Sequence, residues 1–196
     1  MSPGAGARRL ALSAMAVLAG CATAAPEARV DAAEARAREA ADLLFTRLSG
    51  ELSAAMQAGG PPGAVGVCRD RAPAIAQDIA RETGVRIGRT SLRVRNPANA
   101  PDAWEREVLE AFEARRAGGE AWSAMEARQV NGAELRWMRP IPTGALCVSC
   151  HGGAEVSPAT EAALAAAYPR DAARGYAMGD LRGAFTARVP LSPSPR

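Results

Sequence analysis

Lysine is absent from the 196-residue sequence, histidine occurs once, and aromatic residues make up only 4% of the chain. All 24 basic residues are therefore arginines, and 21 acidic residues leave a net charge of +3. The arginines are spread along the whole length, without a dense basic block or interleaved aromatic residues, which is typical of a solvated surface. We therefore expect no nucleic-acid partner.

Long apolar runs are also missing, apart from a short stretch near the start. Two arginines at 8–9 precede apolar residues 10–18, a run too short to span a membrane and typical of a secretory signal. The run ends in Leu18-Ala19-Gly20-Cys21, which is similar to the lipobox of bacterial lipoproteins. We expect residues 1–20 to be a lipoprotein signal peptide and Cys21 to become the acylated N-terminus.

The lipid on Cys21 would tether the protein to a membrane through residues 21–27. Residues 28–190 then have the length of one domain, followed by a flexible tail at 191–196. Ala22 follows the cysteine, and no aspartate there signals retention at the inner membrane, so we expect the periplasmic side of a bacterial outer membrane. The alternative is ordinary cleavage near Ala25, which would remove Cys21 with the signal.

The single histidine closes the run Cys147-Val148-Ser149-Cys150-His151, a C-x-x-C-H motif. In this motif two thiols add across the vinyl groups of a c-type haem, and the adjacent imidazole ligates the iron. The pattern predicts one haem c per chain, and the predicted export agrees with attachment outside the cytoplasmic membrane. Two other interpretations remain: a local disulfide, or a zinc site in which Cys68 completes a Cys₃His set.

One thiol, Cys68, is left over once Cys21 is assigned to lipid and two thiols to haem. An unpaired thiol in an exported protein needs shielding or a use. Because His151 supplies one axial bond and no lysine exists, a sixth ligand would come from Cys68, a methionine, water or a weaker donor. Met56 and Met138 suit core packing better, and a small buried residue is the alternative for Cys68.

Periodic patterns predict a mixed chain of helices and strands. Residues 26–56 form a long amphipathic helix, Gly59–Gly63 breaks it, and residues 64–81 form a second helix that carries Cys68. Further along the chain, the patterns predict strands within 85–94, a helix capped by Asp102 with Trp104, Val108, Leu109 and Phe112 on its buried face, a strand at 135–141, a short helix at 159–167 and a strand at 183–189.

Several stretches together resemble a known family. They are Val67-Cys68 through Ala72-Pro73-Ala74-Ile75-Ala76, Arg89 to Pro97 with Pro101 to Glu105, Pro140-Ile141, Cys147 to Gly152, Tyr168-Pro169 through Gly175-Tyr176 to Gly179-Asp180, and Arg182 to Phe185. These are similar to the c-type haem, PAS-like family first described from a cyanobacterial haem protein. The resemblance covers nearly the whole chain after the signal.

The resemblance implies an α+β fold, a PAS-like antiparallel sheet flanked by helices, with haem held between a histidine and a cysteine. Carried over to this sequence, His151 and Cys68 match the axial iron ligands, and Cys147 and Cys150 match the attachment thiols. A thiolate opposite an imidazole stabilises ferric iron and lowers the reduction potential.

The predicted function is redox work by a tethered haem protein, either electron transfer or sensing. A sensor would open its sixth iron site on reduction and signal through a separate partner protein. A peroxidase is disfavoured, because no distal histidine or acid–base pair is present. Other side chains are candidates for the pocket: Arg89, Arg93, Arg95 and Arg139 for the haem propionates, and Trp104, Trp122, Trp137, Tyr176 and Phe185 for its lining.

Overall fold

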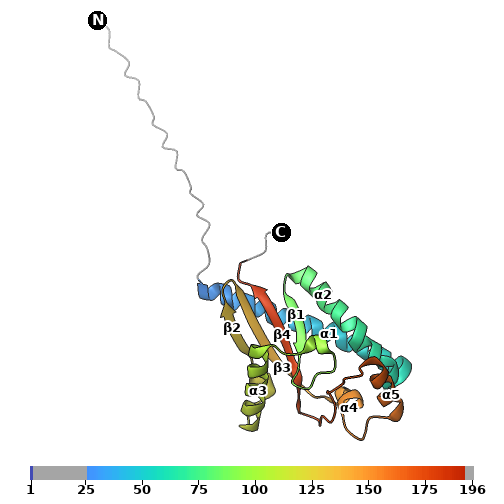
Figure 1. Ribbon diagram of the computed structural model, residues 1–196. Helices are drawn as coiled ribbons and strands as arrows, with labels where there is room; N and C mark the ends of the chain where they lie inside the picture. Colours follow the sequence, from blue (N-terminus) through green and yellow to red (C-terminus); the bar gives the residue numbers. More distant parts are fainter. Residues whose placement is uncertain (2–25, 193–196) are drawn as a thin grey trace.

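A computed structural model describes residue 1 and residues 26–192 (Figure 1). The predicted signal segment, the lipidation site Cys21 and residues 193–196 of the predicted tail lie outside the described residues. Within the described part, no helix is long and apolar enough to cross a membrane.

A long helical arm forms the first third of the domain. Helix α1 (Pro26–Gly66) kinks at Gly60, where φ is 64°, a conformation that glycine adopts without strain. Pro61 and Pro62 follow the kink, so the predicted break falls where the chain bends. Helix α2 (Ala72–Thr83) folds back along α1, so that Glu82 near its end pairs with Arg47 of α1. Between the two helices lies η1 (Val67–Arg71), a π-helical turn in which the N–H of Ala72 donates to the carbonyl of Val67, five residues back.

The sheet has four antiparallel strands in the order β1-β4-β3-β2. Their bounds are β1 (Arg86–Thr90), β2 (Ala127–Asn131), β3 (Glu134–Pro142) and β4 (Leu181–Pro190). The strands predicted within 85–94 and at 135–141 and 183–189 correspond to β1, β3 and β4. The sequence reasoning missed β2, which joins β3 through a two-residue turn with Gly132 at a φ of 60°.

Alternating side chains of the strands build a separate core on each face of the sheet. On one face Leu135, Trp137 and Phe185 pack against the buried stripe of α1 and α2. On the other face Met138 and Ala184 pack against α3 (Ala103–Ala117). Figure 1 shows α1 and α3 on opposite sides of the sheet. The α+β prediction, with an antiparallel sheet flanked by helices and a long N-terminal helix, is therefore confirmed.

Helix α3 begins where the sequence predicts. The Asp102 carboxylate accepts from the backbone N–H of Glu105, and the Glu105 side chain accepts from the N–H of Asp102, at 3.0 Å each. Such a reciprocal capping box satisfies two amide groups that a helix start otherwise leaves unpaired. Arg136 and Arg188, from the neighbouring strands, donate to the second oxygen of Asp102, so this cap also joins α3 to the sheet.

The C-x-x-C-H motif lies at one end of this framework, on α4 (Ala145–His151). Helix α5 (Pro158–Ala167) follows, and its Leu164 and the adjacent Tyr168 form a third apolar cluster with Val65, near the end of α1. Cys150 packs against the same cluster. In Figure 1 the short helices α4 and α5 lie together beside the far end of the helical arm. The fold thus brings the segment around Cys68 to the motif.

Candidate functional site

The two motif cysteines lie three residues apart on α4, so they occupy neighbouring positions on one side of the helix. Both thiols are half-buried and free, and Cys68 is free as well. Burial raises the pKa of the Cys150 thiol, although the positive charge of Arg95 acts in the opposite direction. In residues 26–192, the three thiols and His151 are not gathered closely enough to hold a metal ion. Neither the local disulfide nor the zinc arrangement is formed in this part of the chain.

His151 is held in one tautomer by its backbone surroundings. Its Nδ1 lies 2.9 Å from the carbonyl oxygen of Ala173, and because a carbonyl only accepts, Nδ1 carries the proton. Burial lowers the pKa of His151 to about 2, and the positive charges of Arg182 and Arg95 act in the same direction. The ring is therefore neutral at physiological pH. Its other nitrogen, Nε2, keeps a lone pair that makes no hydrogen bond with the described residues, as a metal-ligating imidazole requires.

Cys68 lies in the π-helical turn η1, where one residue more than usual is fitted into the turn. Turns of this kind occur often at functional sites. The charge of ionised Cys68 raises the pKa of Cys150 and contributes to raising that of Tyr168 to about 12, where burial is the larger cause. Cys68 therefore lies near enough to act electrostatically on Cys150, which precedes α5 in the chain, and on Tyr168, which directly follows it. The fold brings Cys68 and the motif to one end of the molecule.

Two arginines near the motif lack a counter-ion. Arg89 and Arg182 are half-buried, and within the described residues neither pairs with a carboxylate or a carbonyl oxygen. Arg182 donates only to the hydroxyl of Ser91, at 3.1 Å. Burial lowers the pKa of Arg182, and the positive charges of Arg95 and Arg89 add to this effect. Because an unpaired buried cation is costly, this position suits an anionic group of a ligand. Arg182 was not among the sequence candidates.

The other candidate arginines have partners of their own. Arg95 is 7% exposed and forms an ion pair with Asp171, which is 5% exposed, at 3.0 Å. Arg93 stacks 3.5 Å above the ring of Tyr176 and donates to the carbonyl of Arg174. Arg139 pairs with Asp42 on α1. Of the four arginines that the sequence suggests for propionates, only Arg89 has no partner in the described structure.

Most of the aromatic candidates belong to the ordinary cores. Trp137 and Phe185 lie in the core under α1, whereas Trp104 and Trp122 pack on the core under α3. Tyr176 is the exception: its ring lies edge-on to the imidazole of His151, with 6.1 Å between the ring centroids.

The methionines are placed differently from Cys68. Met125 and Met138 are fully buried in the core under α3, so core packing is the observed role of Met138. Met178 is 62% exposed, and Met56 is half-buried on α1. None of these four methionines belongs to the apolar cluster around Cys150.

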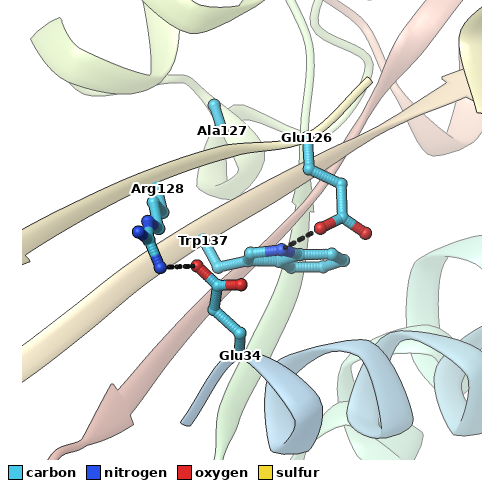
Figure 2. A pocket seen from close by; sticks show the side chains of 5 residues that line it. All are labelled: Glu34, Glu126, Ala127, Arg128 and Trp137. Carbon is cyan, nitrogen blue, oxygen red and sulfur yellow. Dashed lines mark hydrogen bonds and ion pairs between the residues drawn. The ribbon is translucent and has the colours of Figure 1, made fainter. Parts of the chain in front are cut away.

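A polar pocket lies elsewhere, between α1 and the hairpin of β2 and β3 (Figure 2). Its charged groups satisfy one another. Glu126 accepts from the indole N–H of Trp137 at 3.1 Å and pairs with Arg38, while Arg128 pairs with Glu34. We call Glu34, Arg38, Glu126 and Arg128 the paired cluster. Because every charge in it has a partner, it offers no group to a ligand.

The architecture and the motif define a class of protein: a PAS-like α+β domain with a C-x-x-C-H helix at one end of the sheet. The model of the Tll0287-like family, described as Tll0287, matches residues 27–190, and the chain belongs to this family. The crystal structure of the cyanobacterial heme-protein Tll0287 is similar in fold, with a TM-score of 0.65 and 24% sequence identity over 88% of this chain and 100% of that one. No curated protein matches the sequence. The resemblance predicted from the motifs is confirmed.

Proposed function

We propose that the protein binds one c-type haem at this end of the fold and uses it for redox work. The carrying observation is the state of His151, a neutral imidazole with Nδ1–H bonded to Ala173 and Nε2 unbonded, next to two free thiols at the spacing of haem attachment. The related cyanobacterial structure is of a heme-protein, which supports the same cofactor here. Cys147 and Cys150 are the proposed thioether positions, and His151 is the proposed axial ligand.

The unpaired arginines show whether the charges of the site match those of haem. A haem presents two propionates, and arginine binds carboxylates through a planar fork of donors. Arg89 and Arg182 are the half-buried arginines of the described chain with neither a carboxylate nor a carbonyl partner, and the charge of Arg182 acts on His151. The donor set therefore fits the cofactor: a neutral imidazole, two thiols and two unpaired cations. We assign Arg89 and Arg182 to the propionates.

Cys68 is the proposed second axial ligand. When bound, haem supplies a one-electron couple between ferric and ferrous iron. The thiolate of Cys68 brings a negative charge, which favours the ferric form. With His151 and Cys68 both bound, the resting iron would have no position for a substrate, so we propose that the protein is not an enzyme. Replacing Cys68 with alanine should leave the haem covalently attached, change the ferric spectrum and raise the reduction potential. An unchanged spectrum would exclude Cys68 as a ligand.

The proposed setting is the periplasmic side of a bacterial outer membrane, with lipid on Cys21 as the anchor. This rests on the signal-like sequence, since Cys21 lies outside the described residues. A tether would hold the domain near the proteins with which it exchanges electrons or signals. The proposed partner is a separate redox or signalling protein.

Electron transfer and sensing differ in whether Cys68 stays in place on reduction. Protonation makes a thiolate a poorer ligand, so a sensor would release Cys68 and open the sixth position. Carbon monoxide added to the dithionite-reduced protein reports this through the Soret band. Binding would favour a ligand-switch sensor, and its absence would favour electron transfer. The Cys68→Ala variant serves as the positive control, because its sixth position should bind carbon monoxide in either case.

A further inference from the structure

The carbonyl oxygen of Ala173 accepts two hydrogen bonds. One comes from Nδ1–H of His151 at 2.9 Å, and the other comes from Nη2 of Arg95 at 3.2 Å. A carbonyl oxygen has two lone pairs, so both bonds can form together. The same oxygen thus contacts the proposed axial ligand and a buried cation.

Arg95 connects this carbonyl to the motif helix. Its Nη2 also donates to the carbonyl of Cys150, at 2.5 Å, and its Nε donates to Asp171 at 3.0 Å. Asp171 in turn accepts from the backbone N–H of Ala173 at 2.9 Å. The buried ion pair of Arg95 and Asp171 therefore holds the backbone of Cys150, next to His151, and the backbone of Ala173, which accepts the hydrogen bond from His151.

The two members of this pair act on the Ala173 carbonyl in opposite ways. Arg95 donates to the oxygen itself, which makes it a weaker acceptor for the imidazole proton. Asp171 adds a negative charge nearby and accepts a hydrogen bond from the Arg95 guanidinium, which offsets the positive charge that Arg95 presents to this oxygen. A stronger acceptor at Nδ1–H makes the imidazole a more basic ligand, which stabilises ferric iron.

We propose that Arg95 and Asp171 are positioning residues for His151, which fix the carbonyl of Ala173 and set the basicity of the imidazole in opposite directions. This inference rests on the proposed function, because it concerns the haem ligand. The direct electrostatic effects have the same signs. A positive charge near the iron raises the reduction potential, and a negative charge lowers it.

The reduction potentials of Arg95→Gln and Asp171→Asn, measured by redox titration of the haem-loaded proteins, test the proposal. Arg95→Gln should lower the potential and Asp171→Asn should raise it. The expected size is on the order of tenfold in the ferric-to-ferrous ratio at a fixed potential, or about 59 mV for one electron. Arg95→Lys keeps the charge and should restore most of the wild-type potential.

Arg47→Gln is the matched control, because it removes one positive charge from an exposed pair with Glu82 on the helical arm. It should leave the potential close to that of the wild type. Circular dichroism of each haem-free variant shows whether it folds.

Shifts of the same sign in Arg95→Gln and Asp171→Asn, or no shift in either, would overturn the proposal, because a purely structural pair has no reason to give opposite signs. If Arg95→Gln does not fold, the Arg95→Lys and Asp171→Asn variants are compared instead. The reduction potential of Arg95→Lys must then lie closer to the wild-type value than the reduction potential of Asp171→Asn. If wild-type protein carries no covalent haem, the proposed function fails first, and that result is separate.

Discussion

The paired cluster and the motif end of the molecule differ in whether their arginines have carboxylate partners. In the paired cluster, Arg38 lies 2.7 Å from Glu126, and Arg128 lies 2.6 Å from Glu34. At the motif end, Arg89 and Arg182 are half-buried without any carboxylate among the described residues. A protein that buries charge pairs it, because desolvation is costly otherwise. The difference indicates that the arginines at the motif end receive their anionic partners from a ligand, whereas the arginines of the paired cluster already have theirs within the protein.

The backbone of the motif end gives the largest predicted effect. A side chain at Gly152, directly after His151, would meet the Val148 carbonyl oxygen at 2.6 Å. We expect Gly152→Ala to lower the free energy of unfolding by about 2–3 kcal/mol and to reduce covalent haem attachment. Gly153→Ala is the control, because its new methyl group meets only the Glu155 carboxylate at 3.5 Å. Urea titration of both variants would refute the account if they lost equal stability.

Arg182→Leu should change the free energy of unfolding in opposite directions with and without haem. In the haem-loaded protein it should cost about 2 kcal/mol, because a charge-assisted hydrogen bond to a propionate is lost. In the haem-free protein it should be neutral or stabilise by up to about 1 kcal/mol, because an unpaired desolvated cation is removed. Urea unfolding of both forms gives the two values. A loss of equal size in both forms would mean that Arg182 has a structural role only.

Arg38→Leu is the counterpart in the paired cluster. It leaves Glu126 partly buried without its main partner, and we expect a cost of about 1 kcal/mol, limited by the exposure of Arg38, which is 43%. The cost should be the same with and without haem, since every contact of this cluster is internal. A dependence on haem would break the comparison between the two regions.

The sequence predicted what depends on local patterns. The break near Gly60, the cap at Asp102 and the C-x-x-C-H motif all follow from residues close in the chain, whereas the helix α4 that carries the motif was not predicted. Strand β2 was missed because it is an edge strand without apolar alternation, its Arg128, Gln129 and Val130 all being exposed, and only Asn131-Gly132 signals the hairpin.

The site depended on longer-range contacts that spacing does not reveal. Sequence patterns do not distinguish Arg95 from Arg89, yet Arg95 pairs with Asp171, which lies 76 residues further on. Arg182 lies one residue before the strand predicted at 183–189, so the sequence pattern gave no reason to single it out. Its burial arises because loops from elsewhere in the chain, including Ser91 and Tyr176, cover it.

The smallest predicted effect concerns acid stability. Burial raises the pKa of Glu126, but hydrogen bonds from Arg38 and Trp137 outweigh it, and the pKa lies below the usual value of 4.5. Glu126 therefore stabilises the fold above about pH 4.5, and this contribution is lost as the pH falls through the lower folded-state value. Glu126→Gln should flatten the loss of stability below that pH, by at most about 1.4 kcal/mol per pH unit. Arg89→Leu should leave the slope unchanged in urea titrations at about pH 3–6.

Covalent haem attachment tests the central claim most directly. The protein is expressed with the c-type haem maturation system, purified, and measured by intact mass and by the pyridine haemochrome spectrum under denaturing conditions. We expect a mass equal to the processed chain plus one haem, with no haem adduct in the Cys147→Ser/Cys150→Ser double variant and an unchanged haem adduct in Cys68→Ala. A folded wild-type protein without attached haem, or haem that persists in the double variant, would contradict it.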